Sequence, residues 1–230
     1  MFRGDISKSG LALAGLLMAA SGAASAQDGP SIGFGLTGAT DYVWRGYTQS
    51  DENPAIFGSV NIGWGDFYAG AGAENVDFLG IDTEYDVWAG WKRDLGGVTL
   101  DVGLVRYGYL DAPSGLDLDT LEAKLALSGT AGAVAWGAAI FMTDDYFATE
   151  DSASYVEISG SVPIHEAWSA SGALGHQTID AGSDYTTWNA GVRYAVAENA
   201  ALDLRYHDTD ADNSGGAADS RIVFSFSITM

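Results

Sequence analysis

The chain has 230 residues, with 31 acidic and 10 basic side chains, no cysteine and a formal net charge of −21. This length fits one barrel or sandwich domain, or at most two small domains. The 47% of hydrophobic residues is too high for a disordered chain. The acidic balance argues against nucleic-acid binding, which needs a basic surface. The lack of cysteine excludes disulfide scaffolds, thiolate zinc sites and cysteine nucleophiles.

The first 26 residues have the pattern of a secretory signal peptide. Arg3 and Lys8 form a positive start, residues 10–20 form an apolar run, and residues 24–26 read Ala-Ser-Ala, a small-residue cleavage site. The apolar run is too short to span a bilayer core of about 30 Å. We therefore expect residues 1–26 to be removed on export and residues 27–230 to form one domain.

From residue 31 onward, apolar residues alternate with small or polar ones, which is typical of β-strands with one apolar side. The alternation predicts twelve strands, at residues 31–47, 54–64, 67–76, 84–92, 98–107, 120–128, 133–142, 154–164, 168–176, 187–196, 201–207 and 221–230. Tight turns alternate with longer connections, which we place at residues 48–53, 77–83, 108–119, 143–153, 177–186 and 208–220. Even strand number, short turns at one end and long loops at the other are typical of a bacterial outer-membrane barrel.

A soluble barrel alternates in the same way with its apolar side inward, so other features must decide the orientation. The polar side of the strands is rich in Gly, Ser, Ala and Thr rather than in charges suited to water. Aromatic residues gather near both strand ends, with Trp64, Phe67, Trp91 and Trp168 beside tight turns and Trp44, Tyr85, Tyr155, Trp188 and Tyr206 toward long loops. Two such belts favour two lipid–water interfaces. We predict an all-β, 12-stranded antiparallel transmembrane barrel; the alternative is a secreted soluble barrel or sandwich.

If the apolar side faces lipid, twelve charged residues project into the barrel and are our candidate pore-lining residues. They are Arg45, Glu84, Asp86, Lys92, Asp101, Glu122, Lys124, Glu157, Arg193, Asp203, Arg205 and Arg221. Such charges either pair with one another and plug the barrel or line a water-filled channel for small polar solutes. The many small residues on the same side favour the open channel.

The long connections carry a strong negative charge. Taken as residues 48–53, 76–83, 108–120, 142–154, 177–186 and 208–220, they hold 17 acidic residues and no basic residue. These charges can simply keep the loops in water. They can also concentrate cations at a channel mouth and give a mild cation preference. A third interpretation is that divalent ions bridge the loop carboxylates to lipopolysaccharide phosphates.

Signals for catalysis are weak. The three histidines, His165, His176 and His207, are not placed with a serine nucleophile, and neither G-x-S-x-G nor H-x₃-H occurs. We therefore predict that the protein is not an enzyme and has no catalytic residue, metal site or cofactor.

The most distinctive stretch runs from Asp41 to Ala55 and reads DYVWRGYTQSDENPA. It resembles the Y-x-x-R-G-x-x-Q-S-D-x-x-P-A motif of the TorF family of porin-like proteins, a conserved bacterial outer-membrane family of unknown function. Residues 73–78, 84–91, 98–109 and 221–230 are similar to further segments of that family. The resemblance implies a porin-like barrel and matches Arg45 to the family's arginine, but implies no substrate or catalytic residue. The chain ends in Met230, whereas such barrels commonly end in Phe or Trp; we expect this departure to bear on recognition by the barrel-assembly machinery and not on the fold.

Together these patterns predict an outer-membrane porin-like channel for passive diffusion of small polar solutes or ions. The alternative is a non-conducting structural or adhesive barrel whose acidic loops bind lipopolysaccharide, divalent ions or a partner. The expected partners are outer-membrane lipid and lipopolysaccharide, small polar solutes and the barrel-assembly machinery, with no nucleic acid.

Overall fold

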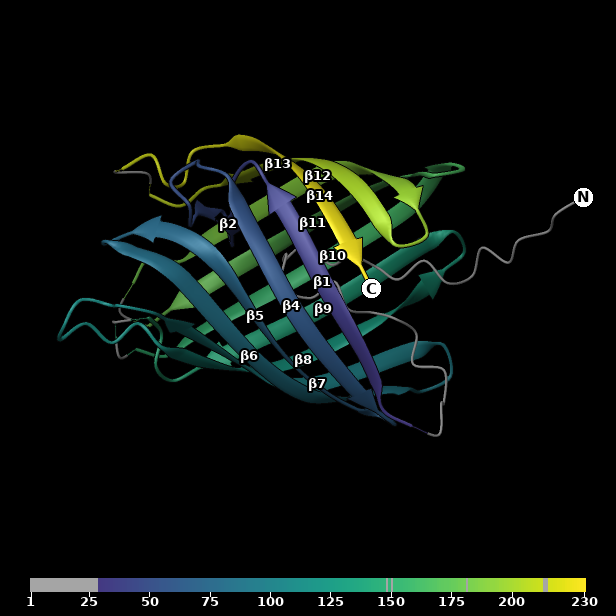
Figure 1. Cartoon of the computed structure of the whole chain (residues 1–230), viewed down its shortest axis with the longest axis horizontal. Helices are drawn as coiled ribbons and strands as arrows, with labels where there is room; N and C mark the ends of the chain where they lie inside the picture. Colours follow the sequence, from purple (N-terminus) through teal and green to yellow (C-terminus); the bar gives the residue numbers. More distant parts are fainter. Residues whose placement is uncertain (1–28, 148, 150, 181, 213–214) are drawn as a thin grey trace, which may run out of the picture.

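Twelve strands close into one antiparallel barrel in the computed structural model, which describes residues 29–147, 149, 151–180, 182–212 and 215–230 (Figure 1). The barrel strands are β1 (Ser31–Ala39), β4 (Ala55–Trp64), β5 (Phe67–Phe78), β6 (Ile81–Asp94), β7 (Val98–Tyr109), β8 (Thr120–Ala131), β9 (Val134–Thr143), β10 (Ala153–His165), β11 (Trp168–Ile179), β12 (Tyr185–Ala197), β13 (Ala200–Thr209) and β14 (Arg221–Thr229). A separate two-stranded hairpin consists of β2 (Val43–Trp44) and β3 (Tyr47–Thr48). No helix in the described ranges is long and apolar enough to cross a membrane. The predicted 12-stranded barrel is confirmed, and the signal peptide at residues 1–26 lies outside the described residues.

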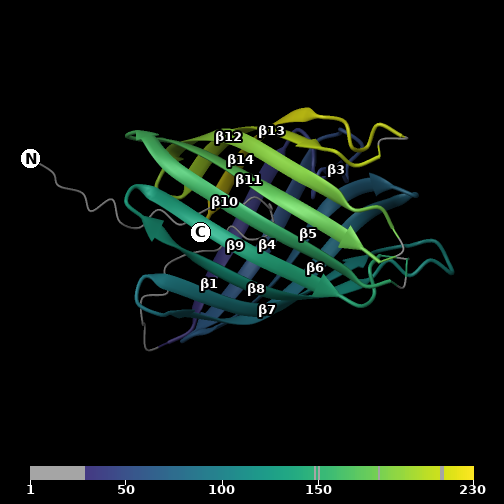
Figure 2. The same cartoon turned by 180° about the vertical axis from the view of Figure 1, so that it is seen from behind.

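The barrel closes where its first and last strands meet. β1 pairs with β14 from Gly35 opposite Thr229 to Ala39 opposite Ser225, and all other neighbours in the barrel are consecutive along the chain. The longer connections gather at one end, at the left in Figure 1 and at the right in Figure 2, and the C-terminus lies toward the other. Closure leaves no open sheet edge, which a strand in lipid requires.

Two segments differ from the predicted strands. The strand expected at residues 31–47 ends at Ala39, and residues 43–48 form the separate hairpin instead. The long connection expected at residues 77–83 is only the pair Leu79-Gly80, because β5 and β6 continue to Phe78 and from Ile81. Leu79 and Gly80 have φ of 53° and 80°, as two-residue hairpin turns need.

The apolar side of the strands faces outward. On β8, Leu125 is 45% exposed, whereas its neighbours Glu122 and Lys124 are buried inside the barrel. Val192 on β12 is likewise exposed on the outer side. A continuous apolar outer surface with polar groups inside is the arrangement of a transmembrane barrel and the reverse of a soluble one.

The aromatic belts are only partly as expected. Among the exposed large side chains, Trp64, Phe67 and Trp168 lie by tight turns, and Trp188 and Tyr206 lie on the other half of their strands. The prediction was wrong for Trp44 and Tyr155. Trp44 is carried by the hairpin and packs on Tyr107, whereas Tyr155 is 5% exposed and faces the interior.

A charge on the outer surface tests this orientation. Leu104 lies in the middle of β7 and is half exposed. Leu104→Arg is expected to lower the free energy of unfolding by about 2–4 kcal/mol, because an arginine at mid-membrane depth is poorly solvated by lipid. Urea unfolding in phospholipid vesicles measures this change. Leu110→Arg, just beyond the end of β7, is the matched control and is expected to cost less than about 1 kcal/mol. Equal losses for the two variants would contradict the orientation.

Candidate functional site

The hairpin formed by β2 and β3 lies inside the barrel. It follows β1 in the chain, but its residues contact the far wall: Trp44 packs on Tyr107 of β7, and Tyr47 packs on Tyr185 of β12. A segment that touches strands across a closed barrel must pass through its interior. The hairpin therefore crosses the lumen near the end that carries the longer connections.

The tip of the hairpin is the pair Arg45-Gly46. Both residues have positive φ, 44° and 90°, as the favoured two-residue hairpin turns require. A Cβ on Gly46 would lie 2.8 Å from Cβ of Thr209 and 3.2 Å from Cγ2 of Thr187. Glycine at this position therefore supplies both the backbone conformation and the close approach of the tip to β12 and β13.

Arg45 extends from the tip to the opposite wall. Its Nη1 and Nη2 each donate a 2.7 Å hydrogen bond to Glu122 on β8, one to each carboxylate oxygen. Nη1 also donates to Oε1 of Gln177 on β11 at 3.0 Å. The side chains of Arg45 and Glu122 are 6% and 2% exposed. This paired geometry is the strongest form of arginine–carboxylate contact.

Aromatic rings enclose the same guanidinium group. Its Cζ lies 4.2 Å from the ring centre of Trp44, 4.3 Å from Tyr155 and 5.3 Å from Phe141. Burial alone would lower the pKa of Arg45, but the adjacent Glu122 carboxylate holds it above its usual value. The guanidinium therefore stays charged, held by one carboxylate and stabilised by the faces of the rings.

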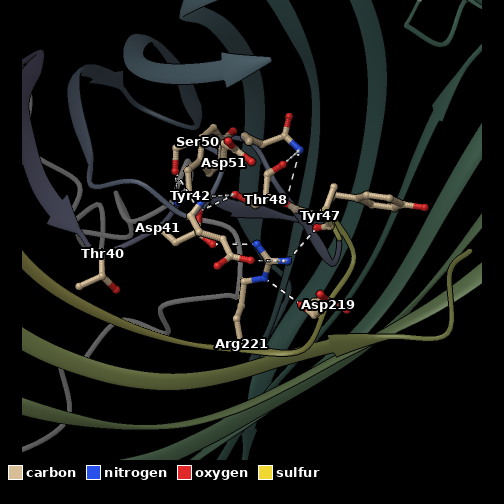
Figure 3. A network of polar contacts seen from close by, with 12 residues as sticks. Thr40, Asp41, Tyr42, Tyr47, Thr48, Ser50, Asp51, Asp219 and Arg221 are labelled. Carbon is tan, nitrogen blue, oxygen red and sulfur yellow. Dashed lines mark hydrogen bonds and ion pairs between the residues drawn. The ribbon is translucent and has the colours of Figure 1, made fainter. Parts of the chain in front are cut away.

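A second polar network anchors the base of the hairpin (Figure 3). Asp41 accepts hydrogen bonds from Thr48 Oγ1 at 2.6 Å and from Ser50 Oγ at 2.9 Å. Arg221 at the start of β14 points toward this base, and its Nη1 donates to Asp41 at 3.0 Å. Arg221 also donates to the carbonyl of Ala217. The hairpin is therefore tied to the last strand and the last long connection.

Four of the other candidate pore-lining residues form ion pairs inside the barrel. Lys124 donates to Asp101 at 2.9 Å and to the Tyr68 hydroxyl at 2.9 Å. Arg205 binds Asp203 on the same strand at 3.0 Å. With Arg45–Glu122 and Arg221–Asp41, four ion pairs form inside the barrel among the described residues.

The remaining five candidates do not join these pairs. Glu84 and Asp86 are buried on β6, and Glu157 accepts a hydrogen bond from Tyr155 at 3.1 Å. Lys92 and Arg193 occupy inward positions toward the tight-turn end of β6 and β12, and no ion pair among the described residues includes them.

Sequence reasoning missed several interior residues. Glu74 on β5 is buried beside Glu84 and Asp86, and Gln177 is fully buried next to Arg45. The period of two could have found Glu74, which shares the inward side of β5 with Tyr68. It could not show that Arg45 comes from a hairpin rather than from the wall, because the partner of Arg45 is distant in sequence.

Solved structures with similar folds are outer-membrane porins and channels. The structure named "KdgM porin" has a TM-score of 0.59 at 6% identity, over 86% of this chain and 97% of that chain. The "NanC porin" structure has a TM-score of 0.57 at 10% identity, over 85% and 97%. The COG4313 outer membrane channel from Pseudomonas putida F1 has a TM-score of 0.50 at 11% identity, over 89% and 96%. At these identities the likeness concerns the fold, which is that of a porin-type barrel.

The sequence itself defines the family. The profile of the family described as "Bacterial protein of unknown function (Gcw_chp)" matches residues 23–228, and the chain belongs to that family. No curated protein sequence matches the chain closely. The resemblance of residues 41–55 to the TorF motif stays a prediction.

The burial of the Arg45–Glu122 pair leads to a stability prediction. Arg45→Ala is expected to lower the free energy of unfolding by about 3–5 kcal/mol, because it leaves the buried Glu122 charge without a partner. Arg106→Ala is the matched control, since Arg106 pairs with Asp119 on the exposed outer side and such pairs contribute about 0–1 kcal/mol. Denaturant unfolding of both variants in the same detergent measures the difference. A loss of under 1 kcal/mol for Arg45→Ala would show that the pair does not hold the hairpin.

Proposed function

We propose that this protein is a porin-like channel of the bacterial outer membrane, through which small polar solutes or ions diffuse passively. The observation that carries the proposal is a closed barrel with an apolar outer surface, a charged interior and a hairpin across its lumen. In this proposal the hairpin forms the constriction, and Arg45 fixes its position.

The type of barrel supports a location in the outer membrane. Single-chain barrels with an even number of antiparallel strands, short turns and longer loops are typical of that membrane. The proposed route is export directed by residues 1–26, followed by insertion by the barrel-assembly machinery. In the membrane, lipid would contact the apolar band and lipopolysaccharide would surround the acidic loops.

The charge distribution supports a preference among solutes. Exposed carboxylates such as those of Asp51, Asp111, Asp144 and Asp180 lie on the connections at the hairpin end. A mouth of this kind attracts cations and repels anions over about a Debye length. One of the similar structures is "KdgM porin in complex with disordered oligogalacturonate". An acidic mouth is unsuited to such a polyanion, so we propose small neutral or cationic solutes for this chain.

A second candidate function is a non-conducting barrel with a structural or adhesive role. The feature that favours it is the close packing of the hairpin, with Tyr42 and the Arg45 side chain almost fully buried. In that case the acidic loops would bind lipopolysaccharide, divalent ions or a partner. We propose no enzymatic role for either candidate.

Single-channel recording separates the two functions. The purified wild-type barrel in planar bilayers is expected to give discrete conductance steps. Arg45→Ala is expected to raise the conductance at least twofold, because the tip loses its contacts with Glu122 and Gln177 and the lumen loses a bulky side chain. Arg106→Ala, on the outer surface, is the matched control and is expected to leave the conductance unchanged.

Each outcome of the recording has one meaning. No conductance in the wild type together with clear steps in Arg45→Ala would favour the plugged, non-conducting barrel. Silence of both variants across repeated reconstitutions would overturn the channel proposal.

Ion selectivity tests the role of the acidic loops. In a KCl gradient at low salt, the reversal potential is expected to show a modest preference for K⁺ that weakens as the salt concentration rises, because salt screens exposed charges. Equal permeability to K⁺ and Cl⁻ at low salt would rule out the cation preference while leaving the channel itself in place.

A further inference from the structure

Three carboxylates meet on the inner wall between β5 and β6. Glu74, Glu84 and Asp86 are 3%, 2% and 0% exposed, and oxygens from all three lie within 4.8 Å of one another. Glu74 is directly opposite Glu84 in the strand pair, a position where like charges destabilise a sheet. The group therefore needs a positive charge or bound protons to remain buried.

The described part of the chain supplies no cation to this group. None of the ion pairs there includes Glu74, Glu84 or Asp86. Four of the buried carboxylate oxygens have no hydrogen-bond partner within the described ranges: one of Glu74, one of Glu84 and both of Asp86. Buried ionised groups are normally paired or coordinate a metal, and buried oxygens without partners call for a bound ion, a water molecule or a proton.

The hairpin places one more oxygen at the same point. Tyr42, at the base of the hairpin, is 2% exposed, and its hydroxyl has no hydrogen-bond partner among the described residues. Burial and the adjacent carboxylates of Glu84, Glu74 and Asp86 raise the pKa of Tyr42 well above its usual value. Its hydroxyl is therefore protonated, and it can hydrogen-bond to a ligand or water held by the carboxylates.

We propose that Glu74, Glu84 and Asp86 bind one divalent cation inside the barrel, and that the cation is Ca²⁺. Calcium takes six to eight oxygen ligands at about 2.3–2.6 Å, so one ion can contact two oxygens that are about 5 Å apart. The observed spacing of at most 4.8 Å fits this limit. Magnesium needs shorter and more regular contacts, near 2.0–2.1 Å, which three carboxylates in this spacing match less well.

The proposed ion would hold the hairpin to the wall on the side away from Arg45. The three carboxylates belong to β5 and β6, whereas Tyr42 belongs to the segment that begins the hairpin. Neutralising the three carboxylates would stabilise the contact between the hairpin and the wall. The site goes beyond the channel proposal and does not depend on it, and it departs from the sequence-based prediction of no metal site.

The proposal is tested by calcium titration of the barrel in detergent. Bound ions are first removed from the protein with a chelator. Isothermal titration calorimetry is expected to show one Ca²⁺ per chain, and added Ca²⁺ is expected to raise the unfolding temperature because only the folded barrel holds the site. Glu84→Gln is expected to weaken binding at least tenfold. Asp144→Asn, which removes an exposed carboxylate from a long connection, is the matched control and is expected to keep wild-type affinity.

The results that would overturn the proposal are distinct from those that concern conduction. Wild-type protein that binds none of Ca²⁺, Mg²⁺ and Mn²⁺ would show that protons neutralise the group. Binding that survives Glu84→Gln but is lost in Asp144→Asn would assign the ion to the loops. Glu74→Gln serves as the second variant if Glu84→Gln fails to fold, and it is likewise expected to weaken Ca²⁺ binding at least tenfold.

Discussion

The arrangement of the interior depends on the buried ion pair between Arg45 and Glu122. A hairpin can stay inside a barrel only if the charge at its tip is balanced there, since an unpaired buried guanidinium is costly. Glu122 supplies that balance through two 2.7 Å hydrogen bonds. The pair joins the first long connection to β8, on the other side of the lumen. It therefore determines how far the hairpin reaches across the barrel and how much of the cross-section it occupies.

The named residues of the Tyr-x-x-Arg-Gly motif lie at the base or the tip of this hairpin in the structure. Tyr42 lies at its base beside the carboxylate group, Arg45 reaches the opposite wall, and Gly46 permits the turn and its close approach to Thr209. Ser50 closes the base by accepting a hydrogen bond from the Tyr42 amide at 2.9 Å. The most distinctive stretch of the sequence is thus the part that crosses the lumen.

The sequence predicted the barrel because alternation is a local property. Each strand carries its own period of two, and closure follows once the apolar side must face lipid. The hairpin escaped prediction because the apolar Trp44 and the charged Arg45 still follow the alternation of residues 31–39, so a strand and a short hairpin look alike. What separates them is the pairing of Val43 with Thr48 and the contacts of Arg45 with β8 and β11. These contacts join residues 77 and 132 positions apart, and no local pattern encodes them.

The small residues on the inner wall have a different meaning from the one the sequence suggested. In the sequence they indicated an open lumen, but several of them lie directly beneath aromatic rings that point inward. The indole of Trp88 covers Gly70, and the phenol of Tyr155 covers Gly175; a Cβ at either glycine would collide with the ring. The space left by the missing side chains is therefore occupied by aromatic rings lying against the wall. Small residues in a barrel strand can thus make room for large neighbours, and lumen width has to be judged from the rings and the hairpin together.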